Sequence, residues 1–358
     1  MSADCGIEIH NATNKRITNN MEGRKMGTIF LVNERKTYLA ITTILFLLVL
    51  SAGCTCFSIP VMERERSLGE TVVSGEGKDK ILLIDISGVI SSKERGGMLP
   101  FQKESSIVSR VHEELKKAAR DKRIKGLIIR INSPGGTATA SDIIYREINK
   151  FKEEKGMPVI ACIMELAASG GYYVAVSADT IIAHPTSVTG SIGVIALKLN
   201  VEGLMEKIGI ENETLTAGDK KDLVSPLRPM TKEEKEIIQN MLNNLHERFM
   251  NIVAKGRRDL NMEQVRVLAD GRIFIAEKAF EEKLVDEIGY MDDAIELVKK
   301  RAGIDEAKVI VYHRPYSYKN NIYSRMMSSD FKNINMVNVD LGGLVNDMGL
   351  RFMYLWLP

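Results

Sequence analysis

The chain has 358 residues, enough for one large domain or two ordinary ones. Its 49 Lys and Arg residues nearly balance its 47 Asp and Glu residues, so the formal net charge is only +2. Nucleic-acid-binding proteins usually concentrate positive charge on one face, and nothing in this balance indicates such a face. We therefore expect no nucleic-acid partner.

The first predicted element is a transmembrane anchor at residues 37–62, which carry no charged side chain. A bilayer core needs about 20 helical residues, so this segment is long enough to span. Arg35 and Lys36 precede it, whereas residues 63–66 (ERER) carry no net charge. By the positive-inside rule, residues 1–36 form a cytoplasmic N-terminal segment and the rest of the chain lies outside, with membrane lipid as a partner.

Three other interpretations of this segment are open. A buried core helix would have a polar face, which this segment lacks. A cleaved signal peptide fits the small residues 51–53 that follow the apolar run. Residues 50–54 (LSAGC) also resemble a lipoprotein box with Cys54 as the lipid-bearing residue, although Ser51 stands where such a box usually has an aliphatic residue. We rank the retained anchor first and the lipoprotein second.

Cysteine usage indicates neither a metal centre nor a redox site. No two cysteines have the C-x-x-C spacing of such sites. Cys162 lies inside an apolar run, where it is expected to act as a small buried hydrophobe. The sequence therefore predicts no metal and no cofactor.

Residues 63–80 are polar and contain three glycines, and we interpret them as a linker. Beyond them apolar runs alternate with amphipathic stretches up to residue 313. Strands are predicted at residues 81–86, 126–131, 158–164 and 180–183, and helices at 105–120, 141–155 and 169–178. Strands separated by helices predict an α/β domain with a parallel sheet and right-handed crossovers. Ligands of such folds gather at the carboxyl ends of the strands.

A long helix is predicted after the strands. Residues 231–234 (TKEE) have the pattern of a capping box, with Thr231 as N-cap and Glu234 three residues later. Apolar residues then recur every three or four positions: Ile237, Met241, Leu245, Phe249 and Ile252. This stripe favours packing in the core or between subunits.

Two loops carry residues suited to acyl-transfer chemistry. The second strand ends in residues 130–136 (RINSPGG) and the third in residues 165–173 (ELAASGGYY), and each leads into a helix. Ser169 on such a turn would be presented to substrate as a nucleophile. Backbone N–H groups in both glycine pairs could hold an oxyanion. Alternatively, the first loop is a simple turn and Ser169 is only an N-cap.

A serine nucleophile needs a general base. The chain has five histidines, at positions 10, 112, 184, 246 and 313, and among them only His184 ends a strand close to Ser169 in sequence. A lysine serves as well where burial lowers its pKa. Residues 216–222 (TAGDKKD) offer Lys220 and Lys221, and the residues alone do not choose between them.

Residues 80–289 resemble the signal peptide peptidase A family of serine-lysine peptidases, which has a Clp protease and crotonase type of fold. The matching motifs are RINSPGG at 130–136, ASGGYY at 168–173, TGSIGV at 189–194, AGDKKD at 217–222 and ADGRI at 269–273. The resemblance implies that Ser169 is the nucleophile, Lys221 its base and Ser191 the residue that orients the lysine amine.

The same resemblance implies that Gly136 and Gly170 supply the oxyanion-hole N–H groups, with Gly135 a near alternative. The domain, residues 81–313, occurs once, as in the short form of the family, which assembles into a homo-oligomeric ring with sites shared between neighbouring subunits. The implied activity is hydrolysis of short apolar peptides, such as remnant signal peptides, at the outer face of a prokaryotic plasma membrane. Two alternatives are a crotonase-like acyl-CoA enzyme and a catalytically silent membrane scaffold.

The C-terminal tail, residues 314–358, falls outside these motifs. It is rich in Asn and Met and ends in an apolar, aromatic segment, residues 351–358 (RFMYLWLP). Exposed apolar clusters usually mark binding surfaces. We expect the tail to dock on the chain's own ring or substrate groove as an extended strand. The alternatives are membrane contact through Tyr354 and Trp356, or a last element packed on the domain.

Overall fold

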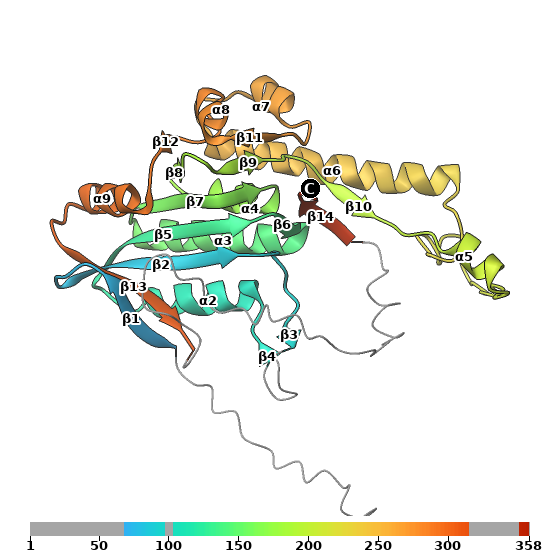
Figure 1. Cartoon of the computed structure of the whole chain (residues 1–358), viewed down its shortest axis with the longest axis horizontal. Coiled ribbons are helices and arrows are strands. Elements are labelled where there is room, and N and C mark those ends of the chain that lie inside the picture. Colours follow the sequence, from blue (N-terminus) through green and yellow to red (C-terminus); the bar gives the residue numbers. More distant parts are fainter. Residues whose placement is uncertain (1–67, 97–102, 315–350, 358) are drawn as a thin grey trace, which may run out of the picture. The chain divides into compact units, whose positions relative to one another are not determined.

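The computed structural model describes residues 68–96, 103–314 and 351–357 (Figure 1). The expected anchor at residues 37–62 and the alternative lipid-bearing Cys54 lie outside these ranges. Within the described ranges, none of the helices combines the length and apolarity that a membrane crossing requires.

A nine-stranded, mostly parallel sheet forms the centre of the domain. Its main path is β1 (Gly69–Ser74), β13 (Ala307–His313), β2 (Asp79–Ser87), β5 (Ile124–Ser133), β7 (Val159–Ala168), β8 (Thr180–Ala183) and β12 (Glu287–Ile288). All neighbours on this path pair in parallel except β1 and β13. The predicted α/β domain with a parallel sheet is confirmed.

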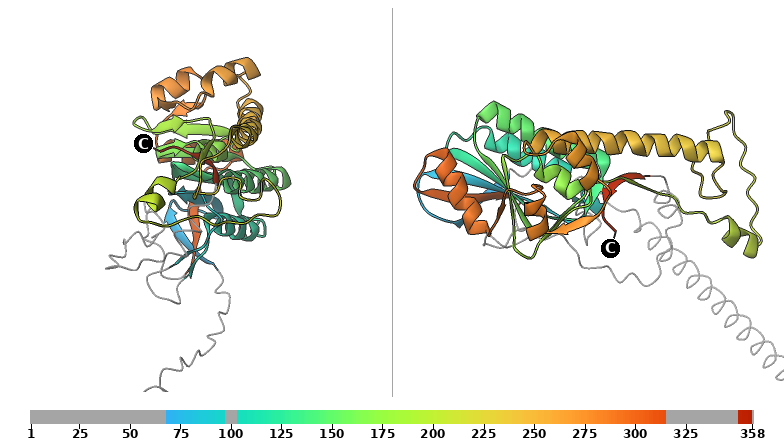
Figure 2. Two further views of the ribbon diagram at one scale, coloured as in Figure 1. Left: turned by 90° about the vertical axis from the view of Figure 1, so that its right-hand side faces the viewer. Right: turned by 90° about the horizontal axis from the view of Figure 1, so that it is seen from above.

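Both faces of the sheet are covered by helices (Figure 2). The residues of β2 alternate between two buried clusters. Leu82, Ile84 and Ile86 face the cluster that includes α2 (Ile107–Ala118), α3 (Ala138–Lys155) and α4 (Gly170–Ala175). Ile81 and Leu83 face the cluster of α9 (Met291–Ala302). This two-sided burial explains the nearly continuous apolar strands of the sequence.

Shorter elements complete the domain. A two-stranded extension, β9 (Val188–Gly190) with β11 (Ile273–Ile275), continues the sheet beyond the carboxyl end of β7. Other short elements are the strand pair β3 (Arg95–Gly96) and β4 (Lys103–Glu104), and the helices α5 (Glu202–Lys207), α7 (Met262–Leu268) and α8 (Ala276–Glu281).

The predicted long helix is α6 (Lys232–Gly256), and its capping box is present. The Thr231 hydroxyl accepts from the Glu234 N–H at 3.2 Å, and the Glu234 carboxylate accepts from the Thr231 N–H at 2.8 Å. Of the predicted apolar stripe, Phe249 is fully buried whereas Met241 is 42% exposed. The stripe therefore packs into the core only in the second half of the helix.

The segment interpreted as a linker, residues 63–80, needs a correction because it contributes β1 at the edge of the sheet. Its glycines suggested a loop, yet residues 71–73 (TVV) are β-branched and suit a strand. They pair antiparallel with β13, more than 230 positions away in sequence. Gly75, with φ of +72°, then turns the chain towards β2.

Candidate active site

Ser169 lies at the junction of β7 and α4. β7 continues to Ala168, four residues beyond the predicted strand end, so Ser169 occupies the turn itself. Its φ of 52° is unusual for a residue other than glycine, and the side chain is 1% exposed. The Ser169 N–H donates to the Gly190 carbonyl at 2.8 Å, and no capping bond uses the hydroxyl. Ser169 therefore occupies the N-cap position of α4, but its side chain makes no capping hydrogen bond.

Ser191 lies beside Ser169. β9 pairs in parallel with the end of β7 so that Gly190 is opposite Ala168, and each serine is the next residue of its strand. Ser191 also has a positive φ, of 51°, and its N–H donates to the Arg272 carbonyl at 2.7 Å. The structure thus brings these two predicted site residues together, both buried.

The three predicted oxyanion-hole glycines lie against one another. Gly135 and Gly136 belong to β6 (Gly135–Thr137), and Gly170 opens α4. A Cβ placed on Gly135 would lie 2.7 Å from the Gly170 nitrogen, and one placed on Gly170 would lie 3.1 Å from the Gly136 nitrogen. Side chains at these positions would collide, so glycine is required. The role of the Gly135, Gly136 and Gly170 N–H groups in holding an oxyanion stays a prediction.

The end of the chain lies at this group of glycines. β14 (Arg351–Leu355) pairs antiparallel with β6 on one side and with β10 (Ile195–Leu197) on the other. The Trp356 N–H donates to the Pro134 carbonyl at 2.9 Å. Because hydrogen-bonded pairs alternate along an antiparallel ladder, Tyr354 and Gly136 form the next such pair. Residues 351–355 thus form a strand packed on the domain, which agrees both with docking as an extended strand and with the alternative of a last element packed on the domain.

The Tyr354 carbonyl oxygen lies against two of the predicted oxyanion-hole glycines, Gly135 and Gly170. A Cβ placed on Gly135 would lie 1.9 Å from this oxygen, and one placed on Gly170 would lie 3.0 Å from it. The carbonyl is therefore in van der Waals reach of both glycines. A peptide carbonyl lying here would stand beside Ser169, the residue before Gly170.

The Tyr354 side chain fills an aromatic pocket between α4 and α6. Its ring stacks on Tyr173 at a centroid distance of 5.1 Å and an angle of 20°, and lies 4.8 Å from the ring of Phe249. The hydroxyl donates to the Leu245 carbonyl at 2.9 Å. Only 1% of Tyr354 is exposed, and burial raises the pKa of its hydroxyl, which stays protonated. Sequence reasoning missed this pocket, because its walls come from three distant segments.

The structure does not bring Lys221 to Ser169 within one chain. Lys221 is exposed, and its neighbour Lys220 pairs with Glu233 in the first turn of α6 at 2.5 Å. Phe249, which contacts Tyr173 beside the serine, lies about 24 Å farther along the same helix at 1.5 Å per residue. Figure 1 shows the neighbouring helix α5 at the end of α6 away from α4. The role of Lys221 stays a prediction.

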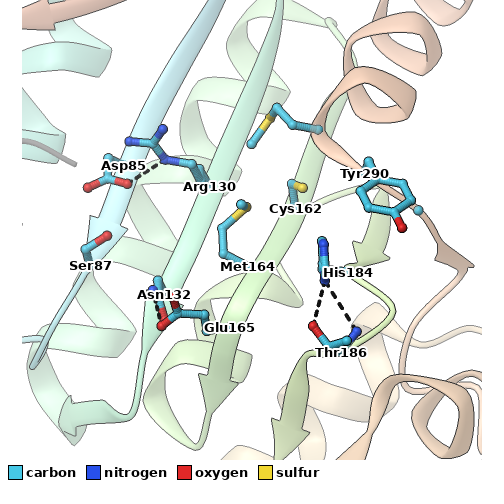
Figure 3. A pocket seen from close by; sticks show the side chains of 12 residues that line it. Asp85, Ser87, Arg130, Asn132, Cys162, Met164, Glu165, His184, Thr186 and Tyr290 are labelled. Carbon is cyan, nitrogen blue, oxygen red and sulfur yellow. Dashed lines mark hydrogen bonds and ion pairs between the residues drawn. The ribbon is translucent and has the colours of Figure 1, made fainter. Parts of the chain in front are cut away.

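His184 belongs to a separate pocket on the α9 side of the sheet (Figure 3). This pocket has a volume of about 510 Å³ and includes Cys162 and the Asp85–Arg130 ion pair. The Nδ1 atom of His184 accepts from the Thr186 N–H at 3.3 Å, and its ring meets the Tyr290 ring edge-on at 4.9 Å. None of these contacts involves Ser169, and they agree with a structural role at a strand end.

Cys162 is 1% exposed, and its sulfur forms no disulfide. Burial raises the pKa of its thiol to about 12, which keeps the sulfur neutral and unreactive. The expectation of a small buried hydrophobe is confirmed.

Comparison with known proteins identifies the family. Residues 151–305 match the family model described as Peptidase family S49. A relative from Enterococcus faecium, provisionally named signal peptide peptidase SppA, is 38% identical over 243 residues, which cover 68% of this chain and 70% of the relative. A relative from Methanocaldococcus jannaschii, provisionally named a protease, is 37% identical over 217 residues, which cover 60% of this chain and 68% of the relative.

Two more distant matches extend this picture. The chloroplastic serine protease SPPA of Arabidopsis thaliana is 33% identical over 76% of this chain and 39% of its own. A solved structure of a ClpP1 mutant from Listeria monocytogenes is 18% identical, covers 60% of this chain and 94% of its own, and superposes with a TM-score of 0.39. From the family model and the closely matching relatives, the chain belongs to peptidase family S49, the signal peptide peptidase SppA family.

Proposed function

We propose that this protein is a membrane-anchored serine endopeptidase whose nucleophile is Ser169 and whose general base is Lys221. The observation that carries the proposal is the buried Ser169 hydroxyl, held at a left-handed turn next to the glycine amides. A backbone of this kind costs about 1–3 kcal/mol and typically persists at functional sites. The family assignment supports the same chemistry, and leaves the acyl-CoA enzyme and the silent scaffold without support of their own.

In the proposed reaction, Ser169 Oγ attacks the peptide carbonyl carbon and a neutral lysine amine takes the hydroxyl proton. The Gly136 and Gly170 N–H groups hold the oxyanion, with Gly135 as the near alternative. The amine then returns the proton to the leaving nitrogen, and water hydrolyses the acyl-enzyme. Ser191, beside Ser169, is the residue proposed to orient the lysine amine.

Substrate is proposed to bind as β14 does, as an extended strand between β6 and β10. The carbonyl of the residue before the scissile bond would take the place of the Tyr354 carbonyl, and its side chain would enter the aromatic pocket. The docked segment is itself largely apolar, RFMYL, which supports short apolar peptides such as remnant signal peptides as substrates. Main-chain pairing gives affinity and the pocket gives selectivity in this mode of recognition.

Lys221 is proposed to reach the serine of a neighbouring subunit in a homo-oligomeric ring. Its segment exposes large apolar side chains, among them Leu199, Leu204, Ile208, Ile210 and, 96% exposed, Leu215. The segment is also braced, because Arg228 bonds both Asp222 and Glu234 at 2.6 Å. A braced segment with exposed apolar residues is typical of an interaction surface, here with a second copy of the chain.

The proposed location is a prokaryotic plasma membrane, with residues 37–62 as a single span and the domain outside; lipid attachment at Cys54 is the alternative anchor. We expect protease added to spheroplasts to degrade the domain beyond residue 66, because Arg35 and Lys36 favour a cytoplasmic N-terminus. Immunoblotting against the domain measures its survival. If the domain and a cytosolic marker both survived the protease treatment completely, the domain would lie in the cytoplasm and the proposed orientation would be wrong.

A fluorophosphonate probe tests the catalytic proposal on the full-length protein in detergent. Such probes phosphonylate activated serines, so peptide mapping should find the adduct on Ser169. Attachment to another serine, or no attachment to a folded protein that cleaves peptides, would reject the assignment.

Deletion of residues 345–358 is expected to lower the apparent KM for short peptides, by about tenfold, with little change in kcat. A tethered strand competes at an effective concentration in the millimolar range, and its removal frees the groove. Steady-state kinetics and sedimentation of both proteins give the readout. The point variant Tyr354→Ala, which removes the ring from the pocket, should act in the same direction. Unchanged kinetics and sedimentation would leave β14 without an inhibitory or assembly role.

A further inference from the structure

We propose that Asp142 is a positioning residue for substrate selection, because it fixes Tyr173 and thereby the aromatic pocket beside Ser169. The inference deepens the proposed function and rests on it. Nothing in the motifs shared with the family points to this aspartate, which lies in the first part of α3.

Tyr173 is the central wall of the pocket. Its N–H donates to the Ser169 carbonyl at 2.8 Å, so the ring is only one helical turn from the nucleophile. The ring contacts three others: Tyr145 edge-on at 5.5 Å, Phe249 at 5.0 Å and Tyr354 in a stack at 5.1 Å. The orientation of this one ring therefore decides whether a flat side chain can stack in the pocket.

Asp142 holds that orientation from outside the pocket. Its Oδ1 atom accepts from the Tyr173 hydroxyl at 2.6 Å, a short, charge-assisted hydrogen bond. The same oxygen accepts from two guanidinium nitrogens of Arg248, Nη2 at 2.6 Å and Nε at 3.2 Å. Burial, together with Asp142, raises the pKa of Tyr173, so the hydroxyl remains a donor. Three helices, α3, α4 and α6, meet at this carboxylate.

The ion pair of Asp142 with Arg248 and its hydrogen bond with Tyr173 contribute differently to the position of the Tyr173 ring. The Arg248 side chain is 55% exposed, and an exposed ion pair contributes little. Tyr173 is fully buried and the Asp142 side chain is 32% exposed, so removing the carboxylate costs the tyrosine hydroxyl its charged acceptor. We therefore assign the positioning role to the hydrogen bond between Asp142 and Tyr173. The ion pair of Arg248 mainly links α6 to the same carboxylate.

Matched peptides that carry Tyr, Leu or Ala before the scissile bond test the proposal on the full-length protein. Asp142→Ala should reduce the ratio of kcat/KM for Tyr over Leu by about tenfold, the usual size of a lost hydrogen bond to a charged group, mainly through KM. Asp142→Asn keeps an oxygen acceptor and should retain most of the ratio. Glu154→Ala, which removes an exposed ion pair with Lys150 on the same helix, is the control and should change nothing.

A second readout does not depend on catalysis. In the inactive Ser169→Ala background, Asp142→Ala should speed amide hydrogen exchange in residues 351–357 while β5 stays protected. The reason is that the Tyr173 ring, on which Tyr354 stacks, loses the hydrogen bond that fixes its orientation. Unchanged exchange would overturn the inference, and so would equal loss of activity on all three peptides. Failure of the fluorophosphonate probe to label Ser169 would instead reject the proposed function, and the exchange result would still decide the role of Asp142.

Discussion

Replacing Ser169 with alanine is expected to lower kcat on a peptide substrate by about 10⁴-fold or more, since loss of a nucleophile removes the covalent route. The fold should remain, because the bonds that hold this turn come from the backbone: the Ser169 N–H donates to Gly190, and its carbonyl accepts from Tyr173. Steady-state kinetics and thermal unfolding of the purified full-length variant measure the two effects separately.

Ser177 provides a matched control for this experiment. It is also completely buried and follows the same short helix, but its hydroxyl is used in a hydrogen bond to the Val174 carbonyl at 2.7 Å. Ser177→Ala should therefore reduce stability and leave kcat near its normal value. Substantial turnover by Ser169→Ala would show that another group is the nucleophile.

The parallel sheet and the two candidate loops at its carboxyl edge could be predicted from sequence because their signals are local. Runs such as residues 81–86 and 126–131 are apolar enough to indicate strands buried on both faces, and the intervening stretches have helical period. Parallel pairing then places the carboxyl ends of β5 and β7 side by side, with both glycine pairs at one edge. This parallel pairing is why Ser169 and the glycines lie together, as the sequence predicted.

The features of the fold and of the site that could not be predicted from sequence depend on contacts between distant segments. Whether residues 351–355 lie between β6 and β10 is decided by backbone pairing and by one aromatic ring, neither of which has a local pattern. The aromatic pocket likewise combines Tyr173 and Phe249 with the side chain that fills it, Tyr354, and the three come from separate segments. The segment of β1 was interpreted as a linker because it is polar and rich in glycine, and its pairing partner, β13, is distant in sequence. Turn residues and hydrophobic periodicity depend on residues that are close in sequence, so they do not predict contacts between distant segments.

Replacing Lys221 with alanine is expected to abolish turnover, with a loss comparable to that of Ser169→Ala, because the two act as a unit. Lys220→Ala should remain active. The hydrogen bond to Glu233 raises the pKa of Lys220, which keeps that amine charged and unfit as a base. His184→Ala should also be active, since His184 contacts Thr186 and Tyr290 rather than the serine. A folded but inactive His184→Ala variant would favour a histidine mechanism.

Mixing the two inactive variants tests where the lysine comes from. If the Lys221 of one subunit serves the Ser169 of the next, a head-to-tail ring that mixes Ser169→Ala and Lys221→Ala subunits at random regains intact sites wherever both functional residues meet, giving about a quarter of normal activity. If each chain used its own lysine, every site would lack one partner and mixing would restore nothing. Co-expression with two affinity tags, followed by tandem purification and kinetics, separates the two cases. Two observations favour recovery of activity on mixing. The segment around Lys221 is exposed and held by ion pairs, and it lies at the start of α6, whereas Tyr173 contacts Phe249 near the other end of that helix.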